Sequence, residues 1–158
     1  MSTDFASTET ARRSPVPAIA VTAATCGATV AVFVPQLVVN AGQVARWPDV
    51  ARFGWLVLAV VLPPLVAYVV ARRHCGRPGA HAAAVAGIPL PLLGVGLAAL
   101  DAWLEVRSGY LLADSGEEAM AYGLGTILGT IYGLVLLVLV ATAATLGVRN
   151  RGPARAAP

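Results

Sequence analysis

Polar and apolar positions in this chain alternate on the scale of whole helices rather than of single residues. Four near-continuous apolar segments of 19 to 27 residues are separated by short polar connections: 16–40, 53–71, 82–103 and 122–148. About 20 apolar residues of helix cross the hydrocarbon core of a bilayer, and helices satisfy every backbone group there. The pattern therefore predicts an all-α membrane protein with four transmembrane helices in an antiparallel bundle.

The composition excludes the soluble classes. Of the 158 residues, 58% are hydrophobic and 12% are charged, whereas about a quarter of the residues in a soluble domain are charged. One charged residue, Asp101, lies inside an apolar segment. The segments also lack the alternation of a membrane β-barrel. We therefore expect a multi-pass protein of the cell membrane, with the lipid bilayer as its first partner.

The distribution of arginine predicts the orientation. The two terminal tails and the connection 72–81 carry eight of the 11 arginines, and the other two connections carry three. Cytoplasmic loops are rich in basic residues, so both termini are predicted to be cytoplasmic. The tails 1–15 and 149–158 are rich in small, polar, Arg and Pro residues and are expected to be disordered. Aromatic residues that mark membrane interfaces fall at the predicted outer boundary: Trp47, Trp55, Trp103 and Tyr122.

The first apolar segment could instead belong to a signal peptide. A polar start and the pair Arg12-Arg13 precede it, as in targeting sequences. The apolar run continues to Asn40, however, well past the 7–15 residues typical of a signal peptide. Cleavage stays open as an alternative that would leave three spans.

Small residues predict close helix packing. Gly125, Gly129 and Gly133 are spaced by four and lie on one helix face, where another backbone can approach closely. The first segment carries a matching small face at Ala23, Gly27 and Ala31. These faces could pack within the bundle, or they could form a homodimer seam or a docking face for another membrane protein.

Prolines are expected to kink three of the helices. They stand within the first, second and third segments, and each removes a backbone donor and frees a carbonyl that a neighbour or water must satisfy. Such breaks are usually features of shape, although paired broken helices also mark transporter sites. The residues concerned are Pro35, Pro63, Pro64, Pro89 and Pro91.

Ionisable groups gather at the predicted outer boundary. Asp101 and Glu105 are four residues apart and share a helix face, where like charges repel unless a cation, a proton or an Arg joins them. They could belong to an ion-pair cluster that fixes the helix end, or to an acid pair that binds a cation or moves a proton. With nearby amides they could line a shallow polar pocket. The whole predicted cluster is Gln36, Asn40, Gln43, Arg46, Arg52, Asp101, Glu105 and Arg107.

Recognised cofactor and catalytic motifs are missing from the sequence. There is no lysine and hence no phosphate-binding loop, and no zinc-protease or nucleophile-elbow motif is present. We expect no metal and no cofactor. Because the arginines flank apolar runs, they are explained by topology, and no nucleic-acid partner is expected.

Three functions fit these features. The favoured one is a small accessory, assembly or immunity-type partner of another membrane protein, which is not an enzyme. The alternatives are a component of a small oligomeric transporter or channel, and a membrane-embedded enzyme. The enzyme would act on a lipid or isoprenoid-like substrate with Asp101 and Glu105 as acid and base.

Overall fold

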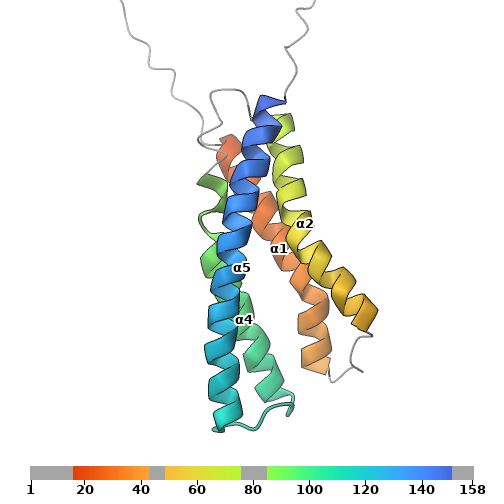
Figure 1. Ribbon diagram of the computed structural model, residues 1–158, viewed down its shortest axis with the longest axis vertical. Coiled ribbons are helices and arrows are strands. Elements are labelled where there is room, and N and C mark those ends of the chain that lie inside the picture. The colour runs from red at the N-terminus through yellow and green to blue at the C-terminus, as the bar shows by residue number, and fades with distance from the viewer. Residues whose placement is uncertain (1–15, 43–48, 76–84, 151–158) are drawn as a thin grey trace, which may run out of the picture.

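The computed structural model describes residues 16–42, 49–75 and 85–150, and this part of the chain is an all-helical bundle in which consecutive long helices run antiparallel (Figure 1). Within these described residues, four helices are long and apolar enough to cross a membrane, which confirms the predicted number of long apolar helices. The elements are α1 (Val16–Gly42), α2 (Asp49–His74), the 3₁₀ turn η2 (Val85–Gly87), α4 (Leu90–Arg107) and α5 (Gly116–Arg149). Of the tails predicted to be disordered, 1–15 and 151–158 lie outside the described residues, whereas Arg149 ends α5 and Asn150 is its C-cap.

The fourth helix begins earlier than its apolar segment, because the acidic connection starts it. The Ser115 hydroxyl accepts a hydrogen bond from the Glu118 backbone N–H at 3.3 Å. The Glu118 carboxylate in turn accepts one from the Asp114 N–H at 2.6 Å. A hydroxyl cap and negative charge both stabilise a helix N-terminus. Glu117 and Glu118 in the first turn of α5 therefore have a structural role.

The third helix corrects one expectation. Pro89 and Pro91 do not kink a continuous helix: η2 ends at Gly87, and α4 begins at Leu90 with Pro89 as its N-cap. The first turn of a helix tolerates proline because its N–H groups have no partner within the helix. Pro35 and the pair Pro63-Pro64 do lie inside helices, in α1 and α2.

The glycine face of α5 packs against α4. A Cβ atom added to Gly129 would lie 2.6 Å from the carbonyl oxygen of Gly94, and one added to Gly94 would overlap the carbonyl of Gly129. Gly133 approaches the backbone of Pro91 in the same way. Gly125 has room for a methyl group, 3.6 Å from the Ala98 side chain. Within this chain, the α5 glycines therefore serve the bundle itself.

The small face of α1 has the opposite environment. Ala23, Gly27 and Ala31 are all exposed, and no heavy atom lies within 4 Å of a Cβ built on Gly27. The other side of the helix faces the core, where Val21 and Thr25 are fully buried. The described bundle thus leaves the α1 stripe exposed.

Most of the apolar surface of the four helices points outward. In the most apolar stretch of each helix, only 17–33% of the residues are buried inside the bundle. The interior is built largely from small residues such as Ala67, Ala71 and Ala144. Large aliphatic side chains such as Leu92 and Val138 are exposed.

The α4–α5 contact predicts a matched pair of alanine variants. Gly129→Ala should destabilise the protein by about 1–3 kcal/mol, because the methyl group would overlap the Gly94 backbone. Gly96→Ala on α4 meets open space, so it should be neutral or stabilise by up to about 1 kcal/mol through helix propensity. Thermal unfolding in one detergent measures both, and equal effects would show that the contact is looser than described.

Candidate functional site: an apolar groove with an acidic end

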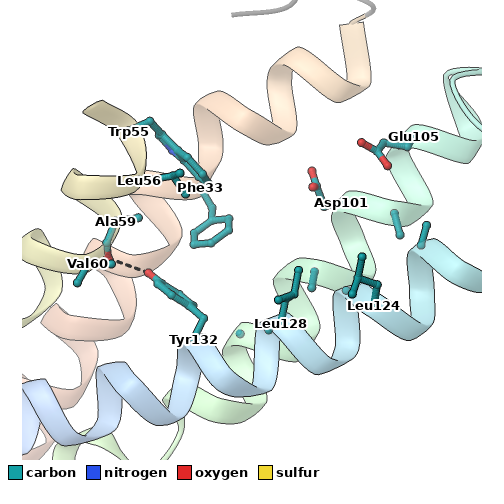
Figure 2. Close-up of a pocket in the computed structure, with 16 residues that line it drawn as sticks. Phe33, Trp55, Leu56, Ala59, Val60, Asp101, Glu105, Leu124, Leu128 and Tyr132 are labelled. Carbon is teal, nitrogen blue, oxygen red and sulfur yellow. Dashed lines mark hydrogen bonds between the residues drawn. The ribbon is translucent and has the colours of Figure 1, made fainter. Parts of the chain in front are cut away.

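All four long helices line an open groove of about 560 Å³ (Figure 2). This volume lies in the range of small-molecule sites, roughly 300–1,000 Å³. Along α5 the lining runs from Ala121 to Tyr132, about 16 Å of helix. The full lining is Phe33, Trp55, Leu56, Ala59, Val60, Gly94, Ala98, Asp101, Ala102, Glu105, Ala121, Leu124, Gly125, Leu128, Gly129 and Tyr132.

Small residues on α4 and α5 give the groove its depth. Gly94, Ala98 and Ala102 follow one another at helical spacing on α4, and Gly125 and Gly129 do so on α5. The same glycines let the two backbones touch. The contact between α4 and α5 has no large side chains, and this leaves space beside it. The small residues therefore account both for the close packing of the two helices and for the groove.

The rim of the groove is aliphatic and outward-facing. Leu56 and Val60 of α2 are 50% and 38% exposed, and Leu124 and Leu128 of α5 are 54% and 55% exposed. These four residues line the groove as well as the outer surface. The groove therefore opens sideways between α2 and α5.

Three aromatic side chains from different helices close one end (Figure 2). Phe33 lies in the middle, with its ring centroid 5.3 Å from that of Trp55 and 5.5 Å from that of Tyr132. Both pairs are edge-to-face, the arrangement that aromatic quadrupoles favour. This cluster joins α1, α2 and α5.

Backbone carbonyls beside the prolines hold this aromatic wall in place. Pro63 has no N–H to donate to the carbonyl of Ala59, four residues earlier. The Tyr132 hydroxyl donates to that carbonyl instead, at 2.8 Å (Figure 2). On α1, the Trp55 indole N–H donates at 2.7 Å to the carbonyl of Val32, in the turn before Pro35. The carbonyl that Pro63 frees thus has an aromatic side chain of the groove as its partner, and the Val32 carbonyl accepts from a second one.

The carboxylates stand at the other end of the groove (Figure 2). The Asn40 amide nitrogen donates to Asp101 Oδ1 at 2.7 Å and lies 3.4 Å from Glu105 Oε1. Asn40 is only 7% exposed, whereas both carboxylates are half-buried. The Gln36 amide lies 3.5 Å from Asn40 Oδ1 and is at most a weak partner. One amide of α1 therefore brings both α4 carboxylates together.

The other residues of the predicted polar cluster are placed differently. Arg107 is exposed, with its guanidinium over the Trp103 ring, 5.2 Å from the ring centroid. Gln43, Arg46 and the side chain of Arg52 lie outside the described residues. The described part of the chain thus brings Gln36, Asn40, Asp101 and Glu105 together, and Arg107 lies on Trp103.

The aromatic wall is not predictable from the sequence. Trp55 is predicted to lie at the membrane interface, and no motif marks Phe33 or Tyr132. The available signal was the proline pair in α2, which required a donor for a freed carbonyl without showing which residue supplies it.

No protein-family model, curated protein or solved structure matches this chain. The shape of the groove suits an elongated apolar molecule, and its acidic end suits a polar head with hydrogen-bond donors.

The Asn40–Asp101 hydrogen bond predicts a strong energetic coupling. A double-mutant cycle with Asn40→Ala and Asp101→Ala should give a coupling energy of about 1.5–3 kcal/mol, as expected for a hydrogen bond to a charged group. Unfolding free energies in one detergent supply the four values. The matched cycle of Gln36→Ala with Asp101→Ala should give almost none, and a similar coupling in both cycles would argue against the assigned bond.

Proposed function

We propose that this chain is a four-span integral membrane protein that binds a lipid-like molecule in the groove between α2 and α5. The outward apolar surface of all four helices supports insertion, since water would leave those side chains poorly solvated. The apolar part of α2, 53–71, is about 28 Å long, close to the thickness of the hydrocarbon core.

We further propose that both termini face the cytoplasm. The C-terminal ends of α2 and α5 lie at the same end of the bundle (Figure 1). The last turns of these helices carry Arg72, Arg73 and Arg149. The opposite end carries Glu117 and Glu118. Basic residues mark the cytoplasmic side of membrane proteins, which supports this orientation.

The lateral opening of the groove is the observation that carries the binding function. Its rim residues, Leu56, Val60, Leu124 and Leu128, belong to the surface that we propose faces lipid. A molecule dissolved in the bilayer could enter between them without crossing water. An apolar cavity with a few convergent polar groups is the usual form of a small-molecule site.

The two alternatives drawn from the sequence both require such binding. A transporter component must hold its cargo, and an enzyme on a lipid must hold its substrate beside Asp101 and Glu105. Binding of an amphiphile is thus the shared step. Loss of turnover in Asp101→Asn with retained binding would favour the enzyme.

The exposed stripe of α1 favours a second candidate, the accessory partner. Ala23, Gly27 and Ala31 form a small-residue face that the bundle leaves uncovered. Such faces allow close approach of another transmembrane helix. The α5 glycines no longer support this candidate, because α4 already covers them.

The orientation predicts opposite accessibility for two introduced cysteines. In a background with Cys26→Ser and Cys75→Ser, a membrane-impermeant maleimide should label Leu112→Cys in intact cells and should leave Asn150→Cys unlabelled. Both positions are exposed, at opposite ends of the bundle. Permeabilised cells provide the control, since both sites should then react; the reverse pattern in intact cells would contradict the proposed topology.

The groove predicts co-purification of a bound amphiphile. Native mass spectrometry of the full chain, extracted mildly from its own membrane, should show a retained small apolar molecule. Ala98→Leu should reduce its occupancy at least about tenfold by filling the groove, whereas Gly96→Leu, on the exposed side of the same helix, should not.

The same preparation separates the two candidates. Unchanged occupancy in Ala98→Leu would contradict binding in the groove. A stoichiometric second protein that is lost in Gly27→Leu, with no bound amphiphile, would support the accessory function instead.

A further inference from the structure

We infer that the aromatic wall limits the length of the chain that the groove accepts, and that Trp55 is the residue that sets this limit. The preferred ligand is a single-chain amphiphile whose apolar part is about as long as a dodecyl chain. This inference rests on the proposed function, because it names the specificity of the same groove. Four observations carry it: the polarity of the two ends, the length of the groove, the bonds that hold the wall, and a second hollow behind Trp55.

The two ends of the groove differ in polarity, and this difference orients a bound amphiphile. Asp101 and Glu105 supply polar atoms at one end, whereas aromatic rings form the other (Figure 2). A polar head placed among the rings would give up its hydrogen bonds to water without replacement, which is costly. The head group therefore stays at the polar end, and the chain points toward the wall.

The length of the groove sets the length of chain that fits in it. From Glu105 to Gly94 the lining follows α4 for about 16 Å, and an extended dodecyl chain has about this length. Along this path the small residues Ala98 and Ala102 leave room for a chain. A hexadecyl chain is longer than the path, so its last carbons would meet the wall.

Hydrogen bonds prevent the wall from moving aside. The Trp55 indole N–H donates to the carbonyl of Val32 at 2.7 Å, and the Tyr132 hydroxyl donates to that of Ala59 at 2.8 Å. Phe33 lies edge-to-face between the two rings. Lipid cannot replace either bond, so rotating a ring would leave polar groups without partners. A longer chain must therefore turn out through the lateral opening and lose its contacts with the closed end.

A second hollow lies behind Trp55. It has a volume of about 340 Å³ and is lined by residues of α1 and α2 that include Ala31, Pro35, Leu58 and Leu62. Among the described residues, Trp55 alone lines both this hollow and the groove. Its indole therefore separates two apolar spaces, and its removal would join them into a longer path. This position makes Trp55 the residue of the wall that determines chain length.

The test uses the full chain in nanodiscs of zwitterionic lipid, with two photoreactive alcohols, one dodecyl and one hexadecyl. Each probe carries a diazirine at the same carbon, counted from the hydroxyl, and only labelling that excess non-photoreactive alcohol removes is counted. Mass spectrometry locates the labelled peptides. At equal mole fraction in the lipid, the dodecyl probe should label the α5 peptide that contains Leu124 and Leu128 at least about tenfold more than the hexadecyl probe, which overpacks the closed end or loses contact with it.

Two variants connect this preference to Trp55. Trp55→Ala should raise labelling by the hexadecyl probe about tenfold, to the level of the dodecyl probe, because the groove then continues into the second hollow. Unchanged labelling by the dodecyl probe shows that the groove is intact. Leu58→Ala is the matched control: it enlarges the second hollow and leaves the wall closed, so the preference for dodecyl should remain.

The results distinguish this inference from the function beneath it. Equal labelling by the two probes in the unaltered chain would overturn the length limit, and this comparison needs no variant. An unchanged preference in Trp55→Ala, or a loss of labelling by both probes, would overturn the assignment of the limit to Trp55, since a purely structural role cannot produce a gain for the longer chain. In each of these cases binding in the groove would stand. Failure of both probes to label the groove of the unaltered chain would overturn the inference and the proposed function together.

Discussion

The contact between the backbones of α4 and α5 at Gly94 and Gly129 is the constraint on which the rest of this structure depends. It removes side chains from both helices along one seam, and α4 is thereby fixed against the longest helix of the bundle. The same absence of side chains continues into Ala98 and Gly125, where it becomes the floor of the groove. Packing and cavity are usually in competition, since a void costs contacts. Here a single run of small residues supplies both, because α4 and α5 touch along it and no large side chain fills the space beside it.

The prolines contribute in a similar double way. Each costs a helical hydrogen bond, which a membrane helix cannot leave unsatisfied. In α2 the carbonyl freed by Pro63, that of Ala59, accepts from the hydroxyl of Tyr132, and this bond fastens α5 to α2 at the end of the groove. The Trp55 indole makes a comparable bond to α1. The aromatic wall is therefore held by directional bonds at its polar atoms and by edge-to-face contacts through Phe33.

The number and approximate place of the helices could be predicted, because hydropathy over about 20 residues is a strong and local signal. The glycine spacing correctly indicated close approach, but it could not identify α4 as the partner, since α1 carries an equally good small face that stays exposed. At the acidic end, the spacing of four residues predicts that Asp101 and Glu105 share one helix face. Asn40 is grouped with them because all three are predicted to lie near the outer membrane boundary. Their bonding depends on how α1 crosses α4, which no local pattern encodes. The groove was beyond reach for the same reason: its lining comes from four helices.

The bond between Tyr132 and Ala59 has a consequence for how such a bundle assembles. In a chain inserted helix by helix, Asn40 is already present when Asp101 arrives, so the carboxylate finds its donor at once. For Ala59 the order is the opposite. Its carbonyl has no helical donor because of Pro63, and the group that donates to it, the Tyr132 hydroxyl, lies on the last helix. Until α5 is in place, the Ala59 carbonyl therefore lacks the hydroxyl donor that Tyr132 provides. An assembly intermediate without the last helix is thus distinguished from the complete bundle by this unsatisfied carbonyl.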